Sequence, residues 1–229
     1  MSSAHKPCDP NPRARNPMTI GDIAATVSGA ARVLSKSGIN YCAMADMSVE
    51  EAAQTHGIDH EALQRELTRL EKTPSSMPED SGELVNFIIS HYHETHRKEL
   101  RELVGLAWHV ETVHHEHQAA PNGLASFLEK IQGDLEDHMH KEESILFPSI
   151  CSGYRGSLFG PIFVMRHEHD DHAKSVRELQ ILTAGFTTPE DACGTWQTLY
   201  DGLEKLTSDL LEHIYVENNV LFPRFEATR

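Results

Sequence analysis

Basic residues are scarce in this chain. Lysine and arginine together number 20, against 35 aspartate and glutamate residues, which gives a formal net charge of −15 at pH 7. A nucleic-acid-binding surface needs concentrated positive charge, so this composition argues against nucleic acid as a partner. The acidic balance otherwise indicates only a well-solvated surface.

Long apolar runs and paired cysteines are also absent. No stretch approaches the roughly 20 apolar residues of a membrane span, and residues 1–17 lack the apolar segment of a secretory signal. The four cysteines form no C-x-x-C pair, which argues against a zinc ribbon or a thioredoxin-like motif. We therefore expect a cytoplasmic protein with no membrane partner, either a monomer or a homodimer.

No run of alternating β-branched residues persists along the chain, so no strands are predicted. The expected fold is all-α, with a C-terminal four-helix bundle and a small N-terminal helical domain. The expected parts are a disordered tail at 1–17, a small helical domain at 18–71, a linker at 72–81 and the bundle at 82–229. In the small domain, Ser48 and Glu51 have the spacing of a capping box that opens a helix.

Four long helices are predicted in the C-terminal part, separated by connections rich in glycine and proline. Their expected ranges are 83–117, 123–147, 162–184 and 189–222. The first is expected to be interrupted near His93. The second and fourth are expected to end before Pro148 and Pro223, because proline disrupts a helix interior.

A repeated segment is the most informative feature of the sequence. Residues 128–148 read LEKIQGDLEDHMHKEESILFP, and residues 203–223 read LEKLTSDLLEHIYVENNVLFP, with matches offset by 75 positions. Both copies contain the polar pattern D-x3-H-x3-E. Steps of four residues keep side chains on nearly one helix face, so each copy directs an imidazole and a carboxylate into the same space.

Thirteen of the 16 histidines follow residue 80, and the chain's turns predict which of them can meet. Helices joined by a short turn run antiparallel, so residues equidistant from the turn lie side by side. The midpoints of His93 and His138 (115.5), His138 and His169 (153.5), and His169 and His213 (191) all fall in or next to connections. These four histidines, one per helix, are therefore predicted to share one layer.

Glu142 and Glu217 lie one turn from two of these histidines. The predicted ligand set is thus two carboxylates and four imidazoles: His93, His138, Glu142, His169, His213 and Glu217. If both carboxylates bridge, each of two ions receives two imidazoles and two carboxylate oxygens. Such donors suit iron, manganese or zinc, and an open mixed site favours redox-active iron.

The other histidines near the predicted layer are given different roles. Those beside the predicted ligands are interpreted as surface or outer residues: His91, His96, His140, His167 and His172. His114 lies 21 positions after His93, about 31 Å along a continuous helix, so only a broken helix returns it to the layer as a fifth ligand.

Three further carboxylates lie close to predicted ligands. Asp134 and Asp209 are placed to accept the second imidazole N–H of a ligand, to line an access channel or simply to face solvent. Glu168, next to His169, is another candidate for a channel.

With this ligand set in hand, the chain resembles hemerythrin-like di-iron domains. It resembles more closely the repair-of-iron-centres (RIC/ScdA) family, which includes nitric-oxide-binding di-iron proteins of denitrifying bacteria. The matching segments are YHETHR, VHHEHQ, HMHKEESILFP, HEHDDH, PEDACGTW and HIYVENNVLFP. They extend over nearly all of residues 85–225.

The resemblance implies a non-haem centre of two iron ions, oxo- and carboxylate-bridged, with Glu142 and Glu217 as the bridges. It also implies nitric oxide binding and the repair of damaged iron–sulfur proteins under nitrosative stress. The alternatives are a di-iron enzyme that reduces nitric oxide or peroxide, or a sensor of oxygen or redox state. No electron-transfer motif is evident, so stoichiometric binding is preferred to steady turnover.

Residues 18–71 then resemble the family's small N-terminal domain. The family usually has two adjacent cysteines followed by glycines, whereas this chain reads Tyr41-Cys42-Ala43-Met44. Cys42 is therefore either a core residue or a single thiol that acts as ligand or nucleophile.

Overall fold

The computed structural model describes residues 19–27, 30–39, 41, 44, 46–70, 77–153 and 156–226. Predictions for the tail at 1–17, for Cys42 and for the first half of the linker therefore fall outside the described residues. The described part is helical apart from its connections, with an isolated bridge between Thr19 and Ser48, which confirms the predicted all-α class.

Four long helical segments form the C-terminal bundle. The first consists of α5 (Ser81–Ile88), η1 (Ile89–His93) and α6 (Glu94–Val113), and the second of α7 (Leu124–Lys141), η2 (Glu142–Leu146) and α8 (Phe147–Cys151). The third is α9 (Phe159–Leu182). The fourth consists of α10 (Gly194–Tyr215), η3 (Val216–Leu221) and α11 (Pro223–Glu226).

Three of the four segments contain a π-helical stretch: η1, η2 and η3. The amides of Glu94, Phe147 and Phe222 bond the carbonyls five residues earlier, at Ile89, Glu142 and Glu217. A π-turn accommodates one extra residue and so changes the direction of the side chains that follow it. The predicted interruption near His93 is confirmed as one of these turns.

The prediction that helices end before Pro148 and Pro223 is wrong. Each proline lies in the first turn of the short helix that follows a π-helical stretch, in α8 or α11. Proline is tolerated there because its missing N–H interrupts little of the helical hydrogen bonding. The fourth helix also begins five residues later than predicted, at Gly194.

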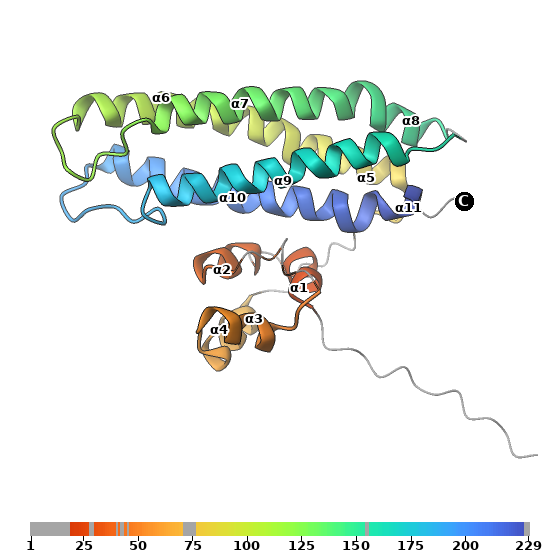
Figure 1. Ribbon diagram of the computed structural model, residues 1–229, viewed down its shortest axis with the longest axis horizontal. Helices are drawn as coiled ribbons and strands as arrows, with labels where there is room; N and C mark the ends of the chain where they lie inside the picture. Colours follow the sequence, from red (N-terminus) through yellow and green to blue (C-terminus); the bar gives the residue numbers. More distant parts are fainter. Residues whose placement is uncertain are drawn as a thin grey trace, which may run out of the picture.

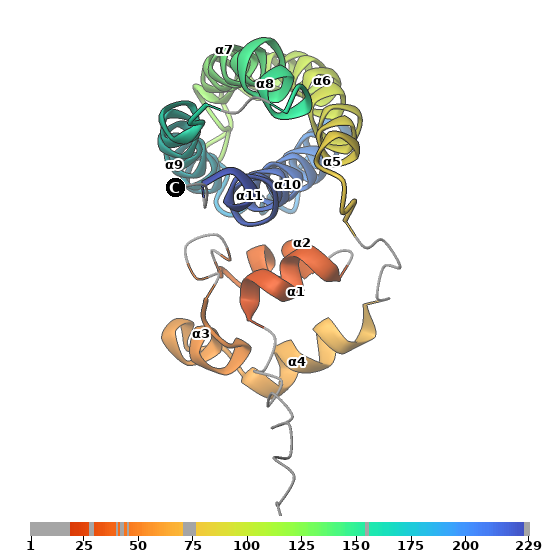
Figure 2. The same ribbon diagram turned by 90° about the vertical axis from the view of Figure 1, so that its right-hand side faces the viewer.

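The four segments form a ring in the order α6, α7, α9, α10, with α10 returning to α6. Figure 1 shows the bundle from the side, and Figure 2 shows it end-on with its segments around a common axis. Each segment is antiparallel to its neighbour in sequence, as the short connections require.

Two apolar clusters fill the ends of the bundle. One includes Leu135 and Leu210, just before the histidines of the repeats, and the other includes Leu146 and Leu221, just after the glutamates. The polar residues of the repeats therefore lie between two apolar regions, which exclude water from both ends of that layer.

The N-terminal helices are α1 (Ile20–Thr26), α2 (Ala30–Lys36), α3 (Val49–His56) and α4 (His60–Arg69). The predicted capping box is confirmed at the start of α3, where Ser48 accepts from the Glu51 amide and Glu51 accepts from the Ser48 amide. This unit packs against α10 (Figure 2), partly through a buried hydrogen bond from the Tyr41 hydroxyl to the Ser208 carbonyl at 3.1 Å.

Two helical glycines provide a test of the contact between α6 and α10. A Cβ at Gly202 on α10 would lie 2.6 Å from Cδ2 of Leu103 on α6, whereas one at Gly133 on α7 meets nothing within 4 Å. We expect Gly133→Ala to raise the free energy of unfolding by about 0.5–1 kcal/mol through helix propensity. Gly202→Ala should lose that gain and cost about 1 kcal/mol or more through overpacking.

Urea denaturation of the two variants beside the parent measures this difference. Equal stabilisation by both alanines would show that the contact at Gly202 is loose.

Candidate metal centre

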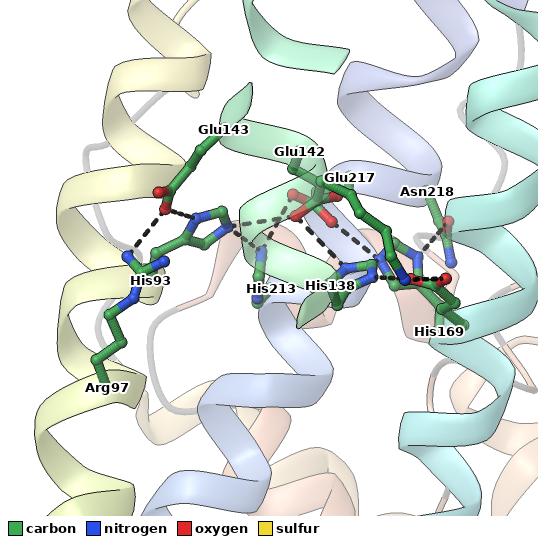
Figure 3. Close-up of polar contacts among 11 residues, drawn as sticks. His93, Arg97, His138, Glu142, Glu143, His169, His213, Glu217 and Asn218 are labelled. Carbon is green, nitrogen blue, oxygen red and sulfur yellow. Dashed lines mark hydrogen bonds and ion pairs between the residues drawn. The ribbon is translucent and has the colours of Figure 1, made fainter. Parts of the chain in front are cut away.

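The structure brings all six predicted ligand residues together in one buried layer (Figure 3). None of the six is more than 1% exposed. They form two groups of mutually close donor atoms that share both carboxylates: His93, Glu142, His213 and Glu217 form one group, and His138, Glu142, His169 and Glu217 form the other. This is the division of two imidazoles and two carboxylates per ion that the repeat suggested.

The hydrogen bonds at Nδ1, on the outer side of each ligand ring, determine whether Nε2, which faces the centre of the layer, carries a proton or a lone pair. Nδ1 of His138 lies 2.9 Å from a Glu168 carboxylate oxygen, and Nδ1 of His169 lies 2.9 Å from the Asn218 side-chain oxygen. Both oxygens are acceptors, so each neutral imidazole carries its single proton on Nδ1 and has a lone pair on Nε2. These two Nε2 atoms are 3.1 Å apart.

Two lone pairs at that distance repel unless a cation lies between them. In the other group, Nδ1 of His93 is 2.7 Å from Glu143, which directs its lone pair from Nε2 towards Nε2 of His213 at 3.2 Å. Neighbouring ligands about 2.1 Å from a metal ion are themselves roughly 3.0–3.4 Å apart. The donor set therefore fits two metal ions.

The central carboxylates also need cations. Both oxygens of Glu142 are buried without a hydrogen-bond partner in the described protein, although Nε2 of His93 and of His138 lie 3.5 Å and 3.4 Å from Oε2. Glu217 lies closer to imidazoles, with His169 at 3.0 Å and His213 at 3.1 Å. Each carboxylate thus faces one histidine from each group, which is the arrangement of a bridging ligand.

The two carboxylates differ in ionisation when no cation is bound. Burial, reinforced by the nearby Glu217 charge, raises the pKa of Glu142 well above its usual value. Burial also opposes ionisation of Glu217, but His213 and His169 outweigh it and hold the pKa of that carboxyl well below its usual range. Without a metal ion the surroundings therefore favour the protonated form of Glu142 and the ionised form of Glu217, and metal ions would compete with protons for both.

A second layer of residues orients the ligands, and it repeats with the same offset. Glu143 follows Glu142 and bonds His93, while Asn218 follows Glu217 and bonds His169 (Figure 3). Each repeat thus supplies two consecutive side chains, one at the centre of the layer and one behind a histidine of a neighbouring helix. Such outer contacts fix the tautomer and orientation of the ligand.

Cations on the surface hold the outer carboxylates in place. Arg97 donates to Glu143 at 2.9 Å and to Glu136 at 2.8 Å, and Lys141 donates to Glu168 at 2.7 Å. Because these pairs are partly exposed, we assign them a positioning role and not a large contribution to stability.

The structure does not place His114 in the layer. His114 follows α6 at the far end of the bundle, where its Nε2 lies 3.2 Å from Sγ of Cys193. The π-turn at His93 redirects side chains, but it does not fold the helix back, so the helical rise keeps His114 distant. A fifth ligand at this position is excluded.

Asp134 and Asp209 do not bond the imidazoles. Asp134 is exposed and pairs with Lys130, and Asp209 pairs with Lys205. Glu168 is instead the carboxylate behind His138, and it also borders a surface groove between α7 and α9 that Asp134 lines.

The sequence interpretation missed Glu143 and Asn218, although their positions after the repeated glutamates were a usable signal. It also left His96 and His172 among surface or outer residues. Both are buried, at 0% and 6% exposure, and their rings lie against His213 and His138, respectively.

Comparison with known proteins agrees with this geometry. The family described as "Hemerythrin HHE cation binding domain" matches residues 85–225, and ScdA_N, a domain of unknown function, matches residues 16–71. A Yersinia pseudotuberculosis protein named "Iron-sulfur cluster repair protein YtfE" is 40% identical over 210 residues, or 90% of this chain and 95% of the relative. The chain belongs to the repair-of-iron-centres family.

Proteins of the same name from Dickeya chrysanthemi and Pectobacterium carotovorum are 39% and 37% identical, with the same coverage. Membership confirms the hemerythrin-like bundle and supports iron binding. The matched segment 85–225 lies within the expected bundle at 82–229, and the segment 16–71 begins two residues before the expected small domain at 18–71. The exact domain limits stay predictions. None of the described helices is both long and apolar enough to cross a membrane.

Burial makes the metal-free layer sensitive to acid. It lowers the pKa of His93 to about 4, with His213 adding to the effect, and it lowers the pKa of His172 to about 4, with His169 adding to it. Burial also lowers the pKa values of His96 and His138 well below 6.5. Glu212 has the opposite effect on stability at low pH, because burial raises its pKa to about 7 and the folded protein then binds a proton more readily than the unfolded chain.

We expect the metal-free protein to lose stability as the pH falls from 6.5 towards 4. Unfolded imidazoles bind protons near pH 6.5, whereas His93 and His172 resist protonation until about pH 4. Each therefore contributes up to about 3 kcal/mol that is present above pH 6.5 and lost on acidification. Urea unfolding at several pH values measures the slope, which His172→Leu should reduce and the exposed His140→Gln should not. A flat profile would contradict the buried neutral imidazoles.

Proposed function

We propose that this protein holds two iron ions in the His/Glu layer and uses them in the repair of iron–sulfur centres in the cytoplasm. The observation that supports this most directly is the convergence of Nε2 lone pairs on two carboxylates in a dry layer. Relatives along nearly the whole chain are named iron–sulfur cluster repair proteins, which supports the repair role.

The residues proposed as ligands are those of the two groups: His93 and His213 for one ion, His138 and His169 for the other, with Glu142 and Glu217 shared. Two ferrous ions held by these residues would supply exchangeable iron and coordination positions that the protein does not fill. Four protein donors per ion leave a six-coordinate ion incompletely surrounded, so this site differs from a closed structural one.

In the repair reaction, iron is the substrate that passes to a damaged cluster. The chain's own residues serve that reaction by holding ferrous iron in a site from which it can leave. Neutral imidazoles dissociate more readily than thiolates would, and the outer bonds from Glu143, Glu168 and Asn218 keep the ligands in place for reloading.

We also propose that the same centre binds nitric oxide under nitrosative stress. The support is the donor set: nitrogen and oxygen ligands with positions left open suit ferrous iron, which binds nitric oxide strongly. The apolar clusters on both sides of the layer admit a small neutral molecule more readily than an ion. Reduction of nitric oxide or peroxide, or sensing of oxygen or redox state, remains the alternative.

Iron content provides the first test. We expect about two iron ions per chain in protein loaded anaerobically with ferrous iron. Glu217→Ala should lose most of the metal, because it removes a donor from both groups and leaves the imidazoles without their anion. The control is Glu116→Ala, a carboxylate at 89% exposure far from the layer. Full iron content in Glu217→Ala would contradict the assignment.

Nitric oxide titration and a repair assay provide the second test. We expect reduced, iron-loaded protein to give an iron–nitrosyl EPR signal on anaerobic addition of nitric oxide. It should also restore activity to an oxidised aconitase-type enzyme, and Glu217→Ala should do neither.

Absence of the EPR signal would refute nitric oxide binding, and an unrestored enzyme beside a working iron donor would refute repair. Analysis of product gas over many equivalents separates binding from catalytic reduction, which would continue beyond two equivalents.

A further inference from the structure

The two halves of the metal centre are related by a repeat in the sequence, and the residues behind the ligand histidines differ between the halves. Offsets of 75 and 76 residues relate His138 to His213, His93 to His169 and Glu143 to Asn218. By the same offset Glu168 corresponds to Tyr92. Glu168 accepts from Nδ1 of His138, whereas Tyr92 stacks flat against the ring of His213, with centroids 5.1 Å apart and planes at 13°.

The consequence is a ligand without its outer partner. Nδ1 of His213 is buried and has no hydrogen-bond acceptor among the described residues, while the other three ligand histidines each have one. A buried imidazole N–H without a partner costs about 1–3 kcal/mol. The stacked phenol ring of Tyr92 faces the plane of the imidazole and not its N–H edge, so it does not remove this cost.

His96 lies beside His213 with the same deficiency. Its ring centroid is 5.4 Å from that of His213, it is fully buried, and neither of its nitrogens has a partner in the part of the chain described. A neutral imidazole offers one donor and one acceptor. One water molecule can accept from one ring nitrogen and donate to another when the two nitrogens are no more than roughly 5–6 Å apart, so it can bond both rings along their edges.

Polar atoms without a protein partner among the described residues continue from His213 and His96 along α6 towards the surface. Glu99, one turn beyond His96, has a buried Oε2 without a partner in the described protein, and its Oε1 accepts from the half-exposed Lys205. Polar atoms without a partner in this described part of the protein therefore extend from His213 through His96 to Glu99, which lies near the surface. The Glu99 carboxylate and the net charge of −15 disfavour an anion there, so the occupant that the charges favour is water.

We propose that His96 is a positioning residue for His213 and acts through a water molecule bound between the two rings. The inference depends on the proposed metal centre and extends it. His213 is the one ligand oriented indirectly, so the ion of the His93–His213 group is held less firmly than the ion of the His138–His169 group. In a protein that gives up iron, this difference designates the ion that leaves first.

The chain provides a matched control at the equivalent position. His172 corresponds to His96 and lies against His138, with ring centroids 5.0 Å apart. Nδ1 of His138 already has Glu168 as its partner, so His172 has no orienting role to perform. Leucine at 96 or at 172 removes a buried imidazole in either case, but only the change at 96 should affect a ligand.

The experiment compares parent protein, His96→Leu, His96→Gln and His172→Leu, each loaded with two ferrous ions, by the rate of iron transfer to a chelator. We expect His96→Leu to release one ion per chain about tenfold faster or more, with the second ion unchanged. His96→Gln, which can still hold a water molecule, should stay near the parent rate, and His172→Leu should match the parent. Thermal unfolding of each metal-free variant shows whether it is folded, so that release rates are compared only between folded proteins.

Equal release from His96→Leu and parent would overturn the proposal, as would equal acceleration in His172→Leu. A saturating content of one ion in His96→Leu would make His96 itself a ligand and would also overturn it. If the parent binds no metal, the proposed function fails instead, so the two failures are distinguishable.

A second measurement needs no variant at position 96. In cobalt-loaded parent protein the four ligand N–H protons give shifted, exchangeable proton resonances. One should exchange with solvent faster than the other three, because a water molecule and not a protein oxygen accepts it. Four equal exchange rates would refute the water bridge.

Discussion

The structure depends on one electrostatic constraint: six polar side chains converge in a buried layer that apolar clusters close at both ends. Four imidazole nitrogens and two carboxylates that approach to about 3 Å repel one another unless protons or metal ions lie between them. The rest of the bundle follows from this requirement. Apolar clusters close the layer at both ends, and the partly exposed acids and bases behind the histidines fix the direction of each ring.

The π-turns reconcile this layer with helical geometry. A regular helix presents the residues of D-x3-H-x3-E on nearly one face, which brings histidine and glutamate together but gives the residue after the glutamate no role. The extra residue of η2 and η3 allows consecutive side chains to serve the same site, with Glu142 at the centre and Glu143 behind His93. The same turns shift the hydrogen bonding so that Pro148 and Pro223 fit where a regular helix would be disrupted.

The repeated segments make the site nearly symmetric in sequence, and the proposed difference in iron release depends on where the repeat fails. Two equivalent ions would be held equally and released together. The exchange of a carboxylate for an aromatic ring between positions 168 and 92 removes a direct bond from His213 while its packing is retained. A single position can therefore differentiate two metal sites without altering any ligand.

The sequence alone determined the class of fold, the helical segments and the six residues that converge. Repeats, turn chemistry and equal distances from turns are local or one-dimensional properties, so they can be read without coordinates. The sequence also carried the offset that pairs Glu143 with Asn218, although its meaning needed the geometry.

Only the tertiary structure decided which side chains stand behind the ligands. Asp134 and Asp209 were candidates by spacing along their own helices, yet the partners come from neighbouring helices or from the residue after a π-turn. It also separated His114 from the layer and buried His96 and His172. These outcomes depend on the rotation of each helix about its axis and on the positions of the π-turns. Packing between helices sets that rotation, so the sequence of one helix alone does not specify it.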